Sequence, residues 1–200
     1  MVLLACMLGA MTSAHSASKT LLVLGDSLSA EYGLARGTGW VPLLEKRLKT
    51  ENVDARIVNA SISGDTSSGG RARLQPLLEK HKPDVVVLEL GANDALRGLP
   101  VTATEENLRA IIASAQKIGA RVLLLGMQIP PNYGGDYTRK FAAVFSTLAS
   151  ERKVALVPFF LAPIVERPDL FQSDRLHPTA EAQPILLDAI WPRLQPLLVK

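Results

Sequence analysis

Five short apolar runs occur beyond residue 20, and apolar residues between them recur at helical spacing. The runs, which we predict to be strands, cover residues 21–24, 57–58, 85–90, 122–125 and 154–157. Glu89 interrupts the third run, and the sequence leaves open whether it is exposed at a sheet edge or hydrogen-bonded to a neighbouring loop. Strands that alternate with helices through right-handed crossovers predict a three-layer α/β/α domain, doubly wound around a five-stranded parallel sheet.

Helices are predicted between these runs, and the clearest has its apolar face at positions 108–118. Thr102 and Glu105 have the spacing of a capping box at its start, and Gly119 is expected to end it. Pro76 lies in another helical stretch, where it must occupy the first turn or kink the helix. No internal repeat or linker divides the chain, so we predict one domain.

The first segment has the pattern of a cleavable signal peptide. Residues 2–11 are apolar but too few to span a bilayer, and residues 12–19 are small and polar. We therefore predict a signal peptide over residues 1–16, a mature domain over 17–200, and a periplasmic or secreted protein. One feature departs from the pattern, because the first eighteen residues contain no Lys or Arg.

Charge and cysteine content exclude several other classes. A net charge of +3 without a long basic run is not typical of a nucleic-acid-binding protein. The one cysteine, Cys6, lies in the predicted signal peptide, in a context that loosely resembles a lipoprotein signal without the charged lead-in. The mature chain then has no disulfide and no thiolate metal site. No Gly-x-Gly-x-x-Gly opens the first helix and no P-loop motif occurs, which disfavours a nucleotide site.

Ser27 directly follows the first predicted strand, at the edge where reactive groups gather in open α/β sheets. Taken alone, Gly-Asp-Ser at this place is an ordinary strand-to-helix turn. His177 is its one credible partner, since His15 falls in the predicted signal peptide and His81 in a charged helix end. Asp174 precedes His177 by three residues, and a turn of that length can bring its carboxylate against one ring nitrogen. These residues are candidates for a hydrolytic triad.

Two later loops at the same sheet edge offer donors for the oxyanion of a tetrahedral intermediate. Gly64 lets the backbone come close and present its N–H, and Asn93 offers a side-chain amide. Each loop alone is an ordinary strand end. The loop acids Asp26, Asp65 and Asp94 are interpreted as bonding local backbone, so no metal and no cofactor are expected.

Taken together, these loops resemble the SGNH hydrolases, the Gly-Asp-Ser-Leu family of esterases and lipases. Residues 25–29 look like the family's first block, Gly64 its second, residues 91–94 its third and residues 174–177 its fifth. The four letters of the name correspond to Ser27, Gly64, Asn93 and His177. The resemblance runs from about residue 20 to the C-terminus, and it implies the flavodoxin-like fold of that family.

The resemblance also implies a mechanism. Ser27 is then the nucleophile, His177 the base, and Asp174 the residue that orients the imidazole. The backbone N–H groups of Ser27 and Gly64 and the side chain of Asn93 would hold the oxyanion.

Within the family, residues 59–66 and 96–98 look closest to the bacterial periplasmic thioesterase, lysophospholipase and arylesterase group. This implies acyl esters and thioesters as substrates, with aryl esters and lysophospholipids among them. Ala92 lies where that group often has a second glycine, and Glu31 occupies a position near the nucleophile that is often glycine. Neither removes a catalytic atom, but Glu31 can alter the charge or shape of the pocket rim.

Two loops flank the expected crevice, and their apolar residues are candidates for an acyl groove. These residues are Leu96, Leu99, Ile129, Pro130 and Tyr133. Two other functions stay open: a carbohydrate acetyl esterase of the wider family, and a non-catalytic ligand-binding protein on the same fold. We expect a small-molecule acyl ester or thioester as partner, no nucleic acid, no stable membrane insertion, and a monomer, because no long exposed apolar stripe is left over.

Overall fold

The computed structural model describes residues 18–199, and its centre is a parallel sheet. The strands are β1 (Lys19–Gly25), β2 (Ala55–Asn59), β3 (Val85–Glu89), β4 (Arg121–Leu125) and β5 (Ala155–Val157). They lie in the order β2-β1-β3-β4-β5, and every neighbouring pair is parallel. The predicted doubly wound, five-stranded parallel sheet is confirmed, and each predicted run overlaps a strand.

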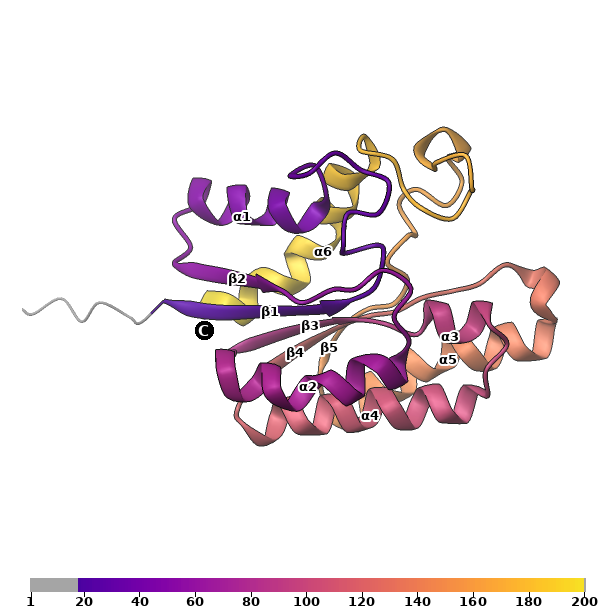
Figure 1. Cartoon of the computed structure of the whole chain (residues 1–200), viewed down its shortest axis with the longest axis horizontal. Coiled ribbons are helices and arrows are strands. Elements are labelled where there is room, and N and C mark those ends of the chain that lie inside the picture. The colour runs from indigo at the N-terminus through magenta and orange to yellow at the C-terminus, as the bar shows by residue number, and fades with distance from the viewer. Residues whose placement is uncertain (1–17, 200) are drawn as a thin grey trace, which may run out of the picture.

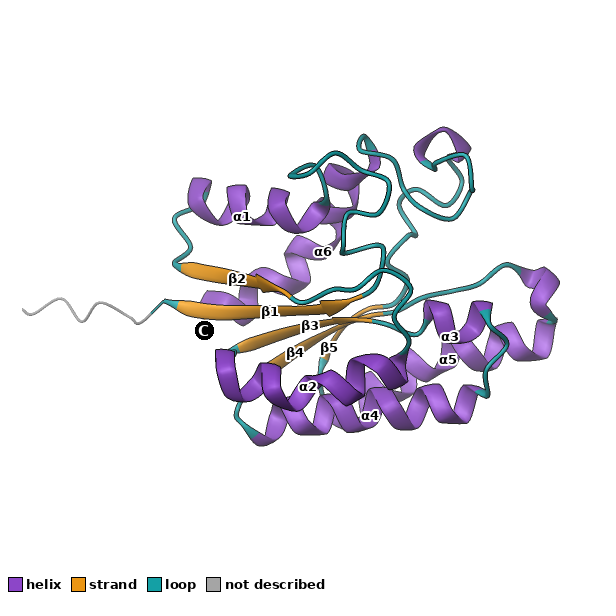
Figure 2. Ribbon diagram, in the orientation of Figure 1, coloured by secondary structure: helices purple, strands orange, loops and turns teal. Residues whose placement is uncertain are grey.

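Helices cover both faces of this sheet, as Figure 1 and Figure 2 show. They are α1 (Trp40–Thr50), α2 (Ser67–His81), α3 (Ala92–Leu96), α4 (Val101–Lys117), α5 (Gly135–Arg152) and α6 (Ala182–Val199), with short 3-10 helices η1 (Pro131–Tyr133) and η2 (Pro168–Leu170). Helices α1 and α6 pack together on one face, and α2, α4 and α5 pack on the other. None of the helices between residues 18 and 199 has the length and hydropathy needed to cross a bilayer. The predicted signal peptide lies outside the described residues.

The two central strands are buried on both faces. Residues 21–24 of β1 and 85–88 of β3 are fully inaccessible to solvent, and Leu22 lies beside Val86 in the register. Strands that are apolar on both faces have no polar face to expose to water, so they are stable only between two layers of helices.

The winding of the chain changes direction at β1, which has β2 on one side and β3 on the other. In open α/β sheets a crevice forms at such a point, outside the carboxyl ends of the strands. The loops that follow β1 and β3 therefore face each other across this crevice. Figure 1 shows the loops after β1 and β5 gathered at the same end of the sheet.

The predicted capping box of Thr102 and Glu105 is wrong. Helix α4 begins at Val101 with Pro100 at its N-cap, so Thr102 lies inside the first turn and no side chain caps the helix. The extended backbone of Pro100 and its missing N–H suit the start of a helix, which moves the boundary ahead of Thr102. Glu105 instead pairs with Arg109 four residues later.

The structure also tests the predictions made for Gly119 and Pro76. Gly119 lies just past α4 with a φ of +83°, as expected for a residue that ends a helix. Pro76 lies inside α2 beyond its first turn, and the helix continues through it to His81.

Candidate active site

Ser27 lies in the tight turn that follows β1. The carbonyl oxygen of Asp26 accepts hydrogen bonds from the N–H groups of Ser29 (3.2 Å) and Ala30 (3.0 Å). One carboxylate oxygen of Asp26, Oδ1, accepts from the N–H of Leu28 at 3.1 Å. A short acid that bonds the backbone two residues further on is a local reason for the chain to turn here. Asp26 is buried by this arrangement, while Ser27 stays half-buried at the crevice.

Asp174 and His177 form a compact turn on the loop between η2 and α6. Oδ1 of Asp174 accepts from the backbone N–H groups of Leu176 (2.9 Å) and His177 (3.0 Å). Oδ2 of Asp174 lies 2.7 Å from His177 Nδ1, and His177 Nε2 lies 2.9 Å from Ser27 Oγ. Arg175 closes the turn in the left-handed region, with a φ of +58°. The structure thus brings Ser27, His177 and Asp174 together, with one partner on each ring nitrogen.

The carboxylate of Asp174 is held in its ionised form. Desolvation raises the pKa of Asp174, but hydrogen bonds from the N–H groups of His177 and Leu176 and from the His177 ring outweigh it and lower the pKa to about 2. An ionised carboxylate at Nδ1 favours the tautomer with the proton on that nitrogen. His177 Nε2 is then free to accept a proton from Ser27.

Tyr32 and Gln172 also contact the His177 loop, and the sequence reasoning missed both. The Tyr32 ring lies over the His177 ring, with centroids 4.4 Å apart and planes tilted by 38°. The backbone N–H of Gln172 donates to the His177 carbonyl oxygen at 2.7 Å. Its side-chain Nε2 donates to the carbonyl oxygens of Tyr32 (2.9 Å) and Pro178 (3.1 Å). Gln172 therefore ties the loop of the candidate nucleophile to the loop of the candidate base.

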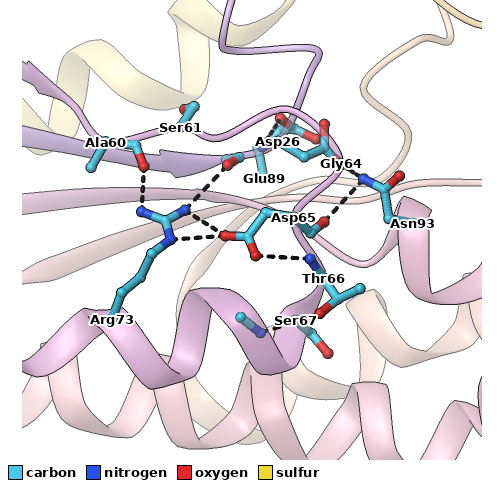
Figure 3. Close-up of polar contacts among 12 residues, drawn as sticks. Asp26, Ala60, Ser61, Gly64, Asp65, Thr66, Ser67, Arg73, Glu89 and Asn93 are labelled. Carbon is cyan, nitrogen blue, oxygen red and sulfur yellow. Dashed lines mark hydrogen bonds and ion pairs between the residues drawn. The ribbon is translucent and has the colours of Figure 1, made fainter.

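The predicted oxyanion donors lie beside Ser27. Gly64 has a φ of +78°, a backbone conformation that residues other than glycine rarely adopt. Asn93 Nδ2 donates to Asp26 Oδ2 (3.0 Å) and to the carbonyl oxygen of Asp65 (3.0 Å), as Figure 3 shows. Within residues 18–199, the backbone N–H groups of Ser27 and Gly64 make no hydrogen bond to protein. Two free N–H groups thus lie near an Asn93 amide whose two N–H bonds are both donated to protein oxygens, one to Asp26 and one to Asp65.

Arg73 of α2 braces this part of the site. Its guanidinium pairs with Asp65, with Nε and Nη2 at 2.8 Å and 2.7 Å from Oδ2. It also donates to the carbonyl oxygens of Gly25 (3.4 Å) and Ala60, at the ends of β1 and β2 (Figure 3). The Asp65 carboxylate accepts from the N–H of Thr66 as well, at 3.0 Å. One cation therefore joins two strand ends to the loop that carries Gly64.

Asp94 and Arg97 fasten the loop that follows β3. Asp94 is buried and accepts from the N–H (2.8 Å) and hydroxyl (2.5 Å) of Ser67, at the start of α2. Arg97 Nη2 donates to the Gly64 carbonyl oxygen at 2.7 Å. The interpretation that these loop acids bond local backbone is thus confirmed for Asp26 and Asp65 and wrong for Asp94, which bonds a helix start distant in sequence. Among the described residues, no three His, Cys, Asp or Glu side chains gather as metal ligands.

The question that the sequence left open for Glu89 has a clear answer. Glu89 is completely buried at the end of β3, where its Oε2 accepts from the Asp26 N–H (3.2 Å) and the Ser29 hydroxyl (2.8 Å). Burial, and then the charge of Asp26, raise the pKa of Glu89 well above its ordinary value. Burial likewise raises the pKa of Asp26 to about 6, against hydrogen bonds that lower it.

The two departures from the family pattern leave the candidate site intact. Glu31 has a φ of +60°, which explains why glycine suits this position. Its Oε1 accepts from the N–H groups of Gly37 (2.9 Å) and Gly39 (2.8 Å), so the carboxylate shapes its own loop. Ala92 is the first residue of α3 and is buried.

A groove of about 1040 Å³ lies next to the His177 loop. Its apolar lining consists of Ile129, Pro130, Pro131, Phe159, Leu161, Val165, Pro168, Phe171 and Leu176. Ile129 and Pro130, two of the predicted substrate residues, are among them. Leu96, Leu99 and Tyr133 are not part of this lining, and the last two are 37% and 40% exposed. The Leu99 carbonyl oxygen accepts from the Tyr137 hydroxyl at 2.6 Å.

A hydroxyl, an imidazole and a carboxylate in line, beside free N–H donors at the switch point of a flavodoxin-like sheet, define the SGNH class of hydrolase. The chain belongs to the GDSL-like lipase/acylhydrolase family, whose model matches residues 23–184.

Similar proteins cover nearly the whole chain. It is 49% identical over 198 residues to "Esterase TesA" of Pseudomonas aeruginosa, and the alignment covers 99% of this chain and 98% of that relative. It is 42% identical over 188 residues to "Thioesterase 1/protease 1/lysophospholipase L1" of Escherichia coli (strain K12), with 94% and 89% covered. Among solved structures, the psychrotrophic esterase EstA from Pseudoalteromonas sp., inhibited by monoethylphosphonate, superposes with a TM-score of 0.86 at 42% identity, covering 92% of this chain and 100% of EstA.

Proposed function

We propose that this protein hydrolyses carboxylic esters and thioesters through an acyl-enzyme formed on Ser27. The observation that carries the proposal is the continuous set of contacts from Asp174 through His177 to Ser27, at 2.7 Å and 2.9 Å. Hydrolysis of esters accords with the chain's membership of the GDSL-like lipase/acylhydrolase family. The roles of the individual residues are the part that requires a test.

Acylation follows from the geometry. Ser27 Oγ attacks the carbonyl carbon while its proton passes to His177 Nε2, and Asp174 stabilises the resulting imidazolium. The carbonyl oxygen becomes an oxyanion, which the N–H groups of Ser27 and Gly64 hold together with the Asn93 amide, once one N–H of that amide turns from the Asp65 carbonyl oxygen to the oxyanion. His177 then gives its proton to the departing alcohol or thiol, and the acyl group stays on Ser27.

Deacylation repeats the same steps with water. A water molecule attacks the acyl carbon as His177 takes its proton, and a second oxyanion forms at the same donors. When this intermediate collapses, the acid leaves and the proton returns from His177 to Ser27. The net reaction consumes one water and regenerates the resting site.

The groove favours acyl chains longer than acetate. Its walls are largely apolar side chains, among them Phe159, Phe171 and Leu176, and a chain placed there removes apolar surface from water. Acyl esters and thioesters, including aryl esters and lysophospholipids, are therefore better candidates than acetylated carbohydrates. Leu96, Leu99 and Tyr133 are proposed to contact the part of the substrate outside this groove.

The test combines labelling with turnover. The mature protein is treated with a p-nitrophenyl alkylphosphonate, and intact mass and peptide mapping locate the adduct. Hydrolysis of p-nitrophenyl esters from acetate to dodecanoate is measured in parallel. One adduct on Ser27, loss of turnover, and higher kcat/KM for longer chains are expected. Ser63→Ala, at an exposed serine beside Gly64, is the matched control and should label normally. Absence of both hydrolysis and adduct would favour a ligand-binding protein.

We further propose that the protein is exported, with residues 1–16 removed, and acts as a monomer without nucleic acid. The apolar run at residues 2–11 supports export. Expression of the full chain in a Gram-negative host, followed by fractionation and intact-mass analysis, tests this. A periplasmic product that begins at Ala17 is expected, and an uncleaved cytoplasmic product would contradict it.

A further inference from the structure

Glu89 is a buried acid for which the proposed reaction has no use. It is fully inaccessible, it ends the central strand β3, and it lies directly behind the turn that presents Ser27. A β-carbon on Gly25 would lie 2.8 Å from Glu89 Oε2, so glycine at that place makes room for the carboxyl group. An ionised side chain placed so deeply, with no cation from residues 18–199 bonded to it, would be strongly destabilising.

The two oxygens of Glu89 have different surroundings. Oε2 accepts two hydrogen bonds, from the Asp26 N–H and from the Ser29 hydroxyl. Oε1 is buried and receives no hydrogen bond from any of the described residues. Buried carboxylate oxygens are normally satisfied by donors, so an oxygen without one is the place for a proton.

The carboxyl group of Asp26 is the acceptor for that proton. The two acids adjoin, since the Asp26 N–H donates to Glu89 Oε2 at 3.2 Å and the charge of Asp26 raises the pKa of Glu89. Neighbouring carboxyl groups can bond to one another only when one of them is protonated. Asp26 already accepts from Leu28 N–H at Oδ1 and from Asn93 Nδ2 at Oδ2, as an ionised carboxylate does. The proton therefore belongs on Glu89 and the charge on Asp26.

We propose that Glu89 is a positioning residue, which stays protonated and donates from Oε1 to the Asp26 carboxylate, so that Asp26 holds the Asn93 amide at the oxyanion site. The inference rests on the proposed function, because it gives Asn93 the role of an oxyanion donor. The chain of contacts runs from the interior of the sheet, through Glu89 and Asp26, to the Asn93 Nδ2 atom (Figure 3). Glu89 itself touches no substrate.

Few charged groups act on this pair. His177, on the loop before α6, lowers the pKa of Asp26 when its ring carries a proton, and Arg73 of α2 reaches the carbonyl oxygen of Gly25 beside Asp26. From α1, the indole N–H of Trp40 donates to the Ser29 hydroxyl at 3.3 Å. Ser29 in turn donates to Glu89 Oε2, so the neighbouring hydroxyl is committed as a donor and leaves Oε1 to Asp26.

The test compares two replacements of Glu89. Glu89→Gln keeps the shape, an acceptor toward Ser29 and an N–H donor toward Asp26, so it reproduces the protonated acid. Glu89→Met keeps the length but gives Asp26 no donor. With p-nitrophenyl butyrate we expect Glu89→Gln to keep kcat within about threefold, and Glu89→Met to lower kcat about tenfold or more with little change in KM, as for the loss of one hydrogen bond to a charged group.

A double-mutant cycle with Asn93→Ala shows whether the effect passes through Asn93. If it does, the loss of kcat caused by Glu89→Met should shrink to less than about threefold when Asn93 is already alanine. A full loss in that background would overturn the proposal, and so would a Glu89→Gln variant as impaired as Glu89→Met. Asn93→Ala with unchanged kcat would instead contradict the proposed function, so the two failures are distinguishable.

The thermal stability of Glu89→Gln tests the proposal even if Glu89→Met does not fold. Because the pKa of Glu89 is raised above its unfolded value, wild-type stability falls as pH rises above the unfolded pKa of 4.5, and Glu89→Gln lacks this loss. The Tm of Glu89→Gln minus that of wild type should therefore increase between about pH 5 and pH 8. Glu106→Gln, at an exposed acid on α4, is the control and should show no such trend. A difference for Glu89→Gln that does not change with pH would overturn the protonated state.

Discussion

The proposed base and the proposed oxyanion donors of this site are built in different ways. Asp174 and His177 lie on an exposed loop, and the contacts that orient the Asp174 carboxylate come from residues two and three positions away. Gly64 and Asn93 depend on long-range contacts to strand ends and to α2.

This difference separates two kinds of substitution. A change at the base removes a chemical group from a loop that contributes little to the core, so the protein should remain folded. A change behind the oxyanion donors removes a brace between secondary-structure elements, so it should lower both activity and stability. Variants in the two regions can therefore be told apart by measuring kcat and the free energy of unfolding together.

The largest expected effect is at the triad. Ser27→Ala or His177→Ala should reduce kcat by roughly 10⁵- to 10⁶-fold, as in other serine hydrolases, because nucleophile and base act as a unit. The free energy of unfolding should change little, since both side chains are half-exposed. Steady-state kinetics and urea denaturation of the same preparations check this. Substantial turnover in Ser27→Ala would rule out the acyl-enzyme on that residue.

Removal of the Asn93 amide should cause the second-largest loss of kcat. Asn93→Ala is expected to lower kcat about a hundred- to a thousandfold, the usual effect of deleting one oxyanion donor. Asn93→Ala also leaves Asp26 Oδ2 without its donor, so some stability should be lost, unlike at Ser27. Unchanged kcat would show that the oxyanion is held elsewhere.

Arg73 tests the brace itself, since it contacts no reacting group. Arg73→Ala should lower the free energy of unfolding by roughly 3 kcal/mol, because Asp65 is then left largely buried without its cation. The same variant should lower kcat about tenfold as the loop of Gly64 loosens. Arg71→Ala, at an exposed position of the same helix, is the control. Equal stability of the two variants would show that the brace has no energetic role.

The pH dependence of activity and of stability tests the role of His177 as the base. Protonation of His177 removes the base, so kcat/KM should fall about tenfold per pH unit on the acid limb. The pKa of Asp174 is lowered from 3.8 to about 2, so the stability it contributes is lost only as pH falls through that lower range. Activity should therefore disappear while circular dichroism still reports a folded protein. A flat rate down to about pH 4 would exclude a neutral histidine base.

The smallest expected effect concerns the aromatic contact on the imidazole. Tyr32 is 50% exposed, so Tyr32→Ala should leave the fold intact and lower kcat by about two- to tenfold as the His177 ring gains freedom. Tyr32→Phe keeps the ring and should keep kcat. Equal activity of both variants would show that the stacking has no role in catalysis.

Much of this arrangement could be predicted from the sequence, because it depends on local order. Apolar runs long enough to be strands, each followed by small polar residues, indicate which side chains gather at one sheet edge. The turn at Ser27 and the Asp174–His177 pair depend on residues within a few positions of each other, so their spacing made them candidates, and the family resemblance then assigned their roles. Asn93 and Gly64 required the family resemblance in addition, since each alone is an ordinary loop residue.

The rest could not be predicted because it depends on contacts between distant segments. Nothing near Arg73 indicates that its guanidinium reaches the ends of β1 and β2. Gln172 and Tyr32 lie 140 residues apart, and no periodicity connects them. The sequence placed Glu89 in a strand but did not show that its side chain is buried. One acid in an apolar run is compatible with either an exposed sheet edge or a hydrogen-bonded interior site. The error at Thr102 arose because Pro100 outweighed a capping pattern.

The groove beside the His177 loop has a consequence for how this enzyme can diverge. Its apolar walls come mainly from the segments after β4 and β5, while the nucleophile and the oxyanion donors follow β1, β2 and β3. Substitutions in residues 128–131 and 159–168 can therefore accumulate without altering any atom of the reacting set. With the acyl chain in this groove, as proposed, descendants of one ancestral hydrolase can exchange short substrates for long ones by small, separately tolerated steps. A laboratory library confined to these segments can follow the same route.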